Sequence, residues 1–330
     1  MAENTKIEWT DHTFNPWIGC TKVGPGCDNC YAADLSKARL GVPWGAGEPR
    51  RHTAASTWKQ PRAWNNRAAK LGIRYRVFCA SLADVFDNEV PAEWRAELFQ
   101  LIRETPHLDW LLVTKRIGNA EKMARAAGCF PSNVWLGATI VNQAEAERDI
   151  PKLLAVQGPR FRFLSMEPLL GPVDLTMLSL SGDAEMDALR PLTWASQVEE
   201  WRDTSDTWQA DFEDWFGHHP DNVSGLIHGA LDWVIVGGES GPHARPMHPD
   251  WARSLRKQCE EAGVPFLFKQ WGEWFPYGGI DADGCQNSRD LGERSGKWHI
   301  WGENDGFSAR VGKKQAGRFL DGIQHDGVPS

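Results

Sequence analysis

The sequence predicts an α/β fold in the form of a full or partial (β/α) barrel. Short apolar runs alternate with longer helical patterns from about residue 74 to residue 271, which makes about seven βα units along the chain. Apolar strands separated by helices are typical of a parallel sheet. Seven units fit a barrel better than an open sheet, although a doubly wound sheet is compatible with the same pattern.

The strands of this fold are expected to be short and apolar. The first is expected near Ile7 to Thr13, before a helix that follows Cys30. The other six are expected at Tyr75–Cys79, Asp109–Thr114, Val134–Thr139, Phe161–Ser165, Trp233–Gly237 and Phe266–Lys269. Helices between them are expected at about 91–104, 117–127, 142–156 and 249–262. In the last of these, Pro249 suits the first turn and Gly263 suits the helix end.

The barrel is expected to occupy residues 1–275, with an insertion at about 172–230. Within the insertion, the acidic stretch 183–221 repeats a tryptophan every seven residues, at Trp194, Trp201, Trp208 and Trp215. This spacing predicts amphipathic helices whose aromatic stripe packs against the barrel or against a protein partner. Residues 276–330, rich in Gly, Asp and Asn, predict a small β-ribbon appendage rather than an independent domain.

Three cysteines, Cys20, Cys27 and Cys30, stand close together on the loop that follows the first predicted strand. A structural zinc site needs four ligands, and His12 is the only nearby fourth candidate. A redox dithiol of Cys27 and Cys30 would leave Cys20 without a role. An iron–sulfur cluster with three protein ligands uses all three thiolates and keeps one coordination position open. The spacing therefore favours a cluster, and zinc remains the alternative.

Polar side chains follow several of the predicted strands. In parallel α/β folds the site lies at the carboxyl ends of the strands, so these side chains are expected to face one mouth together with the cysteine loop. Each of them has an alternative interpretation as a helix cap or as a satisfied polar group at a strand end. The candidates are Ser81, Asp84, Lys115, Arg116, Thr139, Asn142 and Glu239.

The charge distribution bears on partners. The formal net charge of −8 argues against a surface that is basic throughout. Residues 48–76, however, carry eight Lys or Arg against one acid, with Trp58, Trp64 and Tyr75 interleaved. That combination suits a single-stranded or flipped nucleic acid, whereas the alternative is a solvated helix face above core tryptophans. With no export signal and no membrane-spanning run, we expect a cytoplasmic protein with reduced thiols and no membrane contact.

The run Asn15-Pro16-Trp17-Ile18-Gly19-Cys20, followed by Cys27-Asp28-Asn29-Cys30-Tyr31-Ala32, resembles the cluster loop of radical S-adenosylmethionine (radical SAM) enzymes. It is most similar to the spore photoproduct lyase type. Most of the chain also resembles the phage Gp37/Gp68 family, which would place it in a host cytoplasm if it is phage-encoded. The stretches that carry this second resemblance are Ile7–Thr10, Phe163–Leu169, Trp233–Gly241, Phe268–Gly272 and Ala316–Gly322.

The resemblance implies a barrel of the radical SAM type, with a [4Fe-4S] cluster on the three cysteines and S-adenosylmethionine as second cofactor. It further implies an electron donor and a 5′-deoxyadenosyl radical that acts on nucleic acid or a modified nucleotide. Ser81 or Asp84 would meet the methionine amino group, and Lys115 or Arg116 its carboxylate. Thr139 and Asn142 would reach the ribose, and Glu239 the cofactor or substrate; no residue is assigned to catalysis.

The chain differs from the family pattern at three places. Six residues rather than three separate Cys20 from Cys27, and Asn29 stands before the third cysteine where the family usually has an aromatic residue. Ala80-Ser81-Leu82-Ala83-Asp84 stands where the family has Gly-Gly-Glu. Two other function classes therefore stay open. One is a non-enzymatic zinc or iron–sulfur protein that binds nucleic acid through residues 48–76. The other is a redox or scaffold protein that docks a partner through residues 183–221.

Overall fold

A computed structural model describes residues 3–180, 185–190, 230–277, 296–302 and 306–330. The four tryptophans predicted to form a stripe in the insertion lie outside these residues, and so does Cys285. The predictions for the insertion helices and for a protein partner there therefore stay predictions. Among the helices that the structure describes, none has the length and apolar character needed to cross a membrane.

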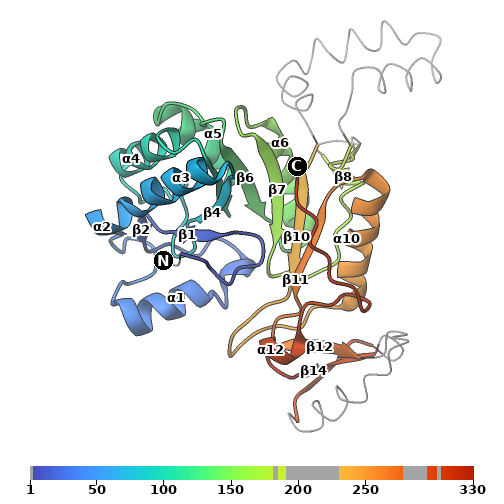
Figure 1. The fold of residues 1–330 in the computed structure, drawn as a ribbon. Helices are drawn as coiled ribbons and strands as arrows, with labels where there is room; N and C mark the ends of the chain where they lie inside the picture. Colours follow the sequence, from blue (N-terminus) through green and yellow to red (C-terminus); the bar gives the residue numbers. More distant parts are fainter. Residues whose placement is uncertain (1–2, 181–184, 191–229, 278–295, 303–305) are drawn as a thin grey trace, which may run out of the picture.

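A parallel sheet forms the centre of the described chain (Figure 1). Its seven strands lie in chain order, and each pairs in parallel with the next. The two edge strands do not pair with each other, so the sheet curls into a partial barrel that stays open. The strands are β1 (His12–Phe14), β4 (Tyr75–Cys79), β5 (Leu108–Thr114), β6 (Val134–Thr139), β7 (Phe161–Met166), β10 (Trp233–Gly237) and β11 (Phe266–Gln270). The predicted fold class is confirmed, in its partial form.

Helices cover the convex side of the sheet, where alternate strand residues such as Leu112, Leu136 and Val236 join one large apolar core with them (Figure 1). The predicted helices lie within about one residue of their observed bounds. The helices are α1 (Tyr31–Leu35), α2 (Ala55–Trp58), α3 (Gln60–Leu71), α4 (Ala92–Arg103), α5 (Ile117–Ala126), α6 (Gln143–Ala155), α10 (Pro249–Ala262) and α12 (Lys313–Ala316), with a 3-10 turn at Pro25–Cys27 and a π-helical turn at Ser36–Leu40.

Aromatic side chains fill the concave side of the sheet. Trp233 lies 6.4 Å from Trp9 and 6.0 Å from Trp135 between ring centroids, both with edge-on geometry. Leu111, Phe163, Ile235 and Leu267 complete this second, separate cluster. Trp135 and Trp233 stand near the amino ends of β6 and β10. This cluster, called the aromatic plug below, therefore fills the barrel at the amino ends of the strands. Within the described residues, the space inside the barrel therefore lies towards the carboxyl ends of the strands.

The last part of the chain forms a small antiparallel sheet and then returns to the barrel. Its strands are β12 (Trp274–Tyr277), β13 (Trp298–Ile300) and β14 (Phe307–Arg310). Beyond α12, the Phe268 amide donates to the His325 carbonyl and the Gly327 amide to the Phe266 carbonyl, each at 3.0 Å. The chain thereby covers the otherwise unpaired edge of β11. The small antiparallel sheet confirms the predicted β appendage, and the segment after it packs on the barrel.

Shorter ladders complete the described structure. The first strand was predicted at residues 7–13, but the strand itself is β1, because Trp9 turns inward to join the aromatic plug. After β1, β2 (Trp17–Ile18) pairs antiparallel with β3 (Arg51–His52) and leads directly to Cys20. A further ladder joins β8 (Leu178–Ser179) to β9 (Glu185–Met186) at the start of the insertion.

Candidate metal and cofactor site

The three cysteines of the loop line one cavity of about 400 Å³ at the carboxyl ends of the parallel strands. Cys20 follows β2, Cys27 ends the 3-10 turn and Cys30 is the residue before α1. Cys20 and Cys27 are buried, Cys30 is partly exposed, and all three are free thiols. Ser81, Asp84, Lys115, Arg116, Thr139 and Glu239 line the same cavity. The structure thus brings together nine of the ten predicted site residues.

The three thiols of this loop fit a cluster with three protein ligands. Within the described residues, no group of three His, Cys, Asp or Glu side chains surrounds one point that an ion could occupy. A single zinc ion requires such a convergence. In a four-iron cluster each cysteine binds a different iron, so three thiols that line one cavity are a suitable arrangement.

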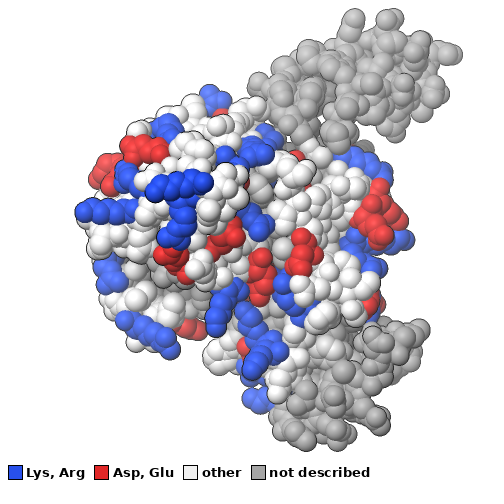
Figure 2. Space-filling model, viewed as in Figure 1, with Lys and Arg blue, Asp and Glu red and all other residues white. Residues whose placement is uncertain are grey.

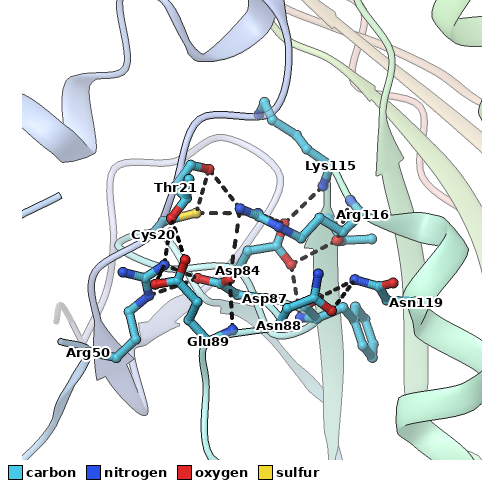
Figure 3. A network of polar contacts seen from close by, with 12 residues as sticks. Cys20, Thr21, Arg50, Asp84, Asp87, Asn88, Glu89, Lys115, Arg116 and Asn119 are labelled. Carbon is cyan, nitrogen blue, oxygen red and sulfur yellow. Dashed lines mark hydrogen bonds and ion pairs between the residues drawn. The ribbon is translucent and has the colours of Figure 1, made fainter. Parts of the chain in front are cut away.

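Arg116 connects the cysteine loop to the ends of the strands (Figure 3). Its Nη1 donates to the Cys20 sulfur at 3.4 Å and to Asp84 Oδ2 at 3.1 Å, and its Nη2 donates to the Thr21 carbonyl at 2.7 Å. Burial lowers the pKa of Arg116, but Asp84, Cys20 and Asp87 more than reverse that shift. Burial, reinforced by Asp84, raises the pKa of the Cys20 thiol to about 11, while Arg116 opposes the rise.

Arg50 anchors the same loop from the other side of Thr21 (Figure 3). Its fully buried guanidinium lies 2.8 Å from Asp87 Oδ2 and 3.1 Å from Glu89 Oε2. It also donates to Thr21 Oγ1 at 2.7 Å and to the carbonyl of Glu48 at 2.7 Å. The position next to Cys20 is therefore held by two arginines, which are themselves held by carboxylates after β4.

Glu239 fastens the far end of the cysteine loop to β10. Arg245 donates to both carboxylate oxygens of Glu239, at 2.6 and 2.9 Å, and Asn29 donates to Oε2 at 3.0 Å. Arg245 also reaches the Pro25 carbonyl at 2.9 Å and Asp28 at 3.3 Å. Burial raises the pKa of Glu239, but the hydrogen bonds from Arg245 and Asn29 outweigh it, so the pKa lies below its usual value.

Replacing Arg245 with Gln is expected to loosen residues 25–30 without unfolding the barrel. Hydrogen bonds to charged groups are worth roughly 1.5–3 kcal/mol, so amide exchange in this segment should accelerate about tenfold or more. Hydrogen–deuterium exchange with mass spectrometry measures this. Lys257→Gln, on the exposed face of α10, is the matched control because its partner Glu261 is on the same helix. Unchanged exchange at residues 25–30 would contradict a tethering role for Arg245.

The remaining predicted residues differ in how far their side chains are already engaged in hydrogen bonds. Lys115 Nζ donates to Thr139 Oγ1 at 3.3 Å and has no carboxylate partner within the described residues. Ser81 Oγ accepts from Asn15 Nδ2 at 3.0 Å. Asn142 is the exception to the shared cavity, because its side chain caps α6 by accepting from the Glu145 amide at 2.9 Å. The capping alternative describes Asn142 in this structure.

Several lining residues were not assigned a role from the sequence. Lys269 lies 3.0 Å from Glu167, and this ion pair raises the pKa of Lys269 although burial alone would lower it. Tyr31 lines the cavity directly after Cys30. Glu8 Oε2 and Gln270 Oε1 are buried in the lining without a hydrogen-bond partner in the described chain. Glu167, Lys269 and Gln270 stand at the ends of predicted strands, and that position was the available signal. Glu8 was marked only as part of the stretch Ile7–Thr10, which carries a family resemblance.

The basic segment 48–76 is different from what its composition predicts. Trp58 and Trp64 are buried, with 6% and 2% of their surface exposed, so the alternative of core tryptophans beneath a solvated face describes these two indoles. Arg62, Arg67 and Arg74 pair with Glu104, Glu3 and Asp109, which are distant in sequence. Figure 2 accordingly shows acidic and basic side chains interspersed over the face in view.

The chain is an α/β protein with a candidate metal and cofactor site. Its parallel sheet forms a partial barrel, and three loop thiols line a charged cavity at the carboxyl ends of the strands. More specifically, the chain belongs to the family described as "Protein of unknown function (DUF5131)", whose model matches residues 4–329. No curated protein matches the chain.

Solved structures of spore photoproduct lyase are similar to this chain at low identity. A mutant with bound AdoMet and dinucleoside spore photoproduct is 10% identical, covers 86% of this chain and 72% of its own, and has a TM-score of 0.36. The lyase complexed with dinucleoside spore photoproduct is 11% identical, with coverages of 91% and 68% and a TM-score of 0.35. At these values the likeness decides nothing about activity.

Proposed function

We propose that the chain is a radical SAM enzyme that holds a [4Fe-4S] cluster on Cys20, Cys27 and Cys30. The observation that carries this proposal is that three thiols of one loop line the same cavity as the charged groups at the strand ends. A cluster held by three cysteines keeps one iron open, as a cofactor that chelates iron requires. The affiliation with the phage Gp37/Gp68 proteins and with the spore photoproduct lyase type is part of the same proposal.

When bound, the cluster and S-adenosylmethionine would together supply a 5′-deoxyadenosyl radical that abstracts hydrogen from the substrate. The chain's own residues would bind and orient the cofactor. Lys115 is the candidate for the methionine carboxylate, because its ammonium group faces the cavity without a carboxylate partner in the described chain. Ser81 is the candidate for the amino group and Thr139 for the ribose, since each lines the cavity and carries a hydroxyl.

The other predicted cofactor residues would act through the cysteine loop. Both carboxylate oxygens of Asp84 already accept two hydrogen bonds each. Thr114 and the Phe86 amide donate to Oδ1, and Arg116 and the Lys115 amide donate to Oδ2. Glu239 is similarly committed to Arg245 and Asn29. Breaking such buried charged contacts to bind a ligand would cost several kcal/mol, roughly 3–5 for a buried pair. Asp84, Arg116 and Glu239 are therefore assigned to positioning.

Nucleic acid or a modified nucleotide remains the proposed substrate, and an external electron donor is implied. The unpartnered acceptors Glu8 Oε2 and Gln270 Oε1 support a ligand that carries N–H donors, as nucleobases do. Any contact of residues 48–76 with the backbone of a nucleic acid would rely on exposed cations such as Lys59 and Lys70, since the tryptophans are buried.

The proposal is tested by anaerobic reconstitution with iron and sulfide. Wild-type protein is expected to bind about four irons per chain, as one four-iron cluster requires. Cys27→Ala should lose most of that iron, because one of three protein ligands is gone. Cys129→Ala is the matched control: Cys129 is a free, exposed thiol that does not line the cavity, so iron binding should be unchanged. Iron content and the visible absorption spectrum report both outcomes.

Two results would replace the proposal with an alternative. One zinc per chain and no cluster would favour a non-enzymatic zinc protein. A cluster that forms but releases no 5′-deoxyadenosine from S-adenosylmethionine under reducing conditions would favour a binding or redox role.

A further inference from the structure

Among the three cysteines, only Cys20 receives a hydrogen bond from a charged side chain within the described residues. Arg116 Nη1 lies 3.4 Å from the Cys20 sulfur, and Nη2 is fixed on the Thr21 carbonyl at 2.7 Å. Two contacts from one planar guanidinium to adjacent residues set both the position and the orientation of the group. Cys27 and Cys30 have no comparable contact in the described chain.

The guanidinium is buried and held from behind by carboxylates. The side chain of Arg116 is 8% exposed and that of Asp84 is 7% exposed, and their charged atoms are 3.1 Å apart. Asp87 lies 3.9 Å from Arg116 and is itself paired with Arg50 at 2.8 Å. Asp84 is in turn fixed by the hydroxyl of Thr114 at 2.8 Å. The cation beside Cys20 therefore has little freedom to move away from the sulfur.

Such a group has a predictable effect on a redox centre. Reduction adds one negative charge to an iron–sulfur cluster, and hydrogen bonds to its sulfurs and nearby charges shift its reduction potential. A cation next to a ligand thiolate stabilises the reduced form, whereas a carboxylate destabilises it. Inside a protein these effects are larger than in water, because the effective dielectric constant is lower.

We propose that Arg116 raises the reduction potential of the cluster through its contact with Cys20, and that Asp84 limits this rise by partly neutralising Arg116. The proposal rests on the proposed function, because it presumes the cluster. It gives Asp84 a role that differs from the one implied by its place in the Ala80–Asp84 stretch: a positioning and tuning residue for Arg116, not a contact of the cofactor.

Redox titrations followed by electron paramagnetic resonance test the proposal on reconstituted full-length protein. Arg116→Gln is expected to change the ratio of reduced to oxidised cluster at least tenfold towards the oxidised form. For a one-electron couple this equals a shift of about 59 mV to more negative potential. Asp84→Asn is expected to shift the potential in the opposite direction, because it leaves the charge of Arg116 less compensated. A purely structural role would not produce opposite signs from the two sides of one ion pair.

Arg125→Gln is the matched control. It removes the same charge from α5, the helix that Arg116 precedes, but Arg125 is exposed and pairs with Glu121, so the potential should stay at the wild-type value. Arg116→Lys covers the case in which Arg116→Gln fails to fold. It keeps the charge and loses the two-point contact, so a smaller shift to negative potential is expected.

The outcomes separate the two proposals. Wild-type protein that holds no cluster would overturn the proposed function and this inference with it. A cluster whose potential is the same in wild type and in the Arg116 variants, or that moves in the same direction in Arg116→Gln and Asp84→Asn, would overturn only the tuning role.

Discussion

Replacement of Arg50 by Met is expected to lower the free energy of unfolding by about 3–5 kcal/mol, the usual cost of removing one partner from a buried ion pair. The Arg50 side chain has no exposed surface and lies 2.8 Å from Asp87, which is itself 3% exposed. Met fills a similar volume but leaves the Asp87 carboxylate buried with a lost partner. It also removes the donor to Thr21 Oγ1, next to Cys20. Denaturant unfolding, followed by circular dichroism, measures the change.

Arg62→Met is the matched control for this prediction. Arg62 also pairs with a carboxylate, Glu104, but the two side chains are 50% and 39% exposed. Exposed ion pairs contribute about 0–1 kcal/mol, so this variant should unfold close to the wild-type midpoint. Equal losses for Arg50→Met and Arg62→Met would show that the buried network around Thr21 contributes no more than a surface pair.

Gly238→Ala is expected to destabilise the protein by about 3 kcal/mol or more, at the upper end of overpacking effects. A Cβ atom at residue 238 would lie 1.9 Å from the Trp271 carbonyl oxygen, which is backbone and cannot rotate away. At Gly272, which has a φ of +79°, a Cβ atom would similarly lie 2.1 Å from the Glu239 carbonyl oxygen. The segments after β10 and β11 therefore touch through their backbones, and only glycine allows this approach.

The control for Gly238→Ala has the opposite expected sign. Gly118 lies in the first turn of α5, and the nearest atom to an added Cβ would be Lys152 Cδ at an ordinary 3.7 Å. Alanine is a better helix former than glycine by about 0.8–1.0 kcal/mol, so Gly118→Ala should stabilise or leave stability unchanged. Thermal denaturation of the two variants side by side measures the contrast. A mild effect of Gly238→Ala would mean that the two segments can separate without cost.

The same contact explains Gly238 within the run Gly237-Gly238-Glu239-Ser240-Gly241, whose glycines also suit a phosphate-binding loop. The Gly238 amide donates to the Gln270 carbonyl at 2.8 Å, so it is not directed at an anion. Glycine at this position serves the approach of two chain segments. A sequence pattern cannot distinguish these roles, because both require backbone without a side chain.

The sheet was predictable because its signal is local. The strands of the parallel sheet from β4 onward are short and mostly apolar, and α10 has its own start and end signals in Pro249 and Gly263. β1 was less predictable. Trp9 leaves the expected strand to pack against Phe78 and Trp233, and this depends on a concave surface that forms only when distant strands assemble.

The site was predictable in place but not in pairing. Functional polar groups gather at the carboxyl ends of parallel strands. This rule predicted that Asp84, Arg116 and Glu239 lie at one cavity, and they do. Which of them face a ligand and which face each other depends on residues such as Arg50 and Arg245, whose partners lie 37 and 6 positions away. The role of the tryptophans in residues 48–76 could not be predicted for a related reason, since composition does not distinguish a stacking surface from a core.

The lining of the cavity joins the two ends of the described chain, since Lys6 to Trp9 contribute one part of it and Lys313, on α12, contributes another. A ribosome-bound chain would therefore expose an incomplete cavity, with its cysteines open to solvent and oxidants, until residue 313 has emerged. Cluster assembly would then be a step that follows translation and folding. If the proposed function holds, cluster assembly would depend on delivery of iron and sulfide to a barrel that is already folded, and not on capture by a growing chain.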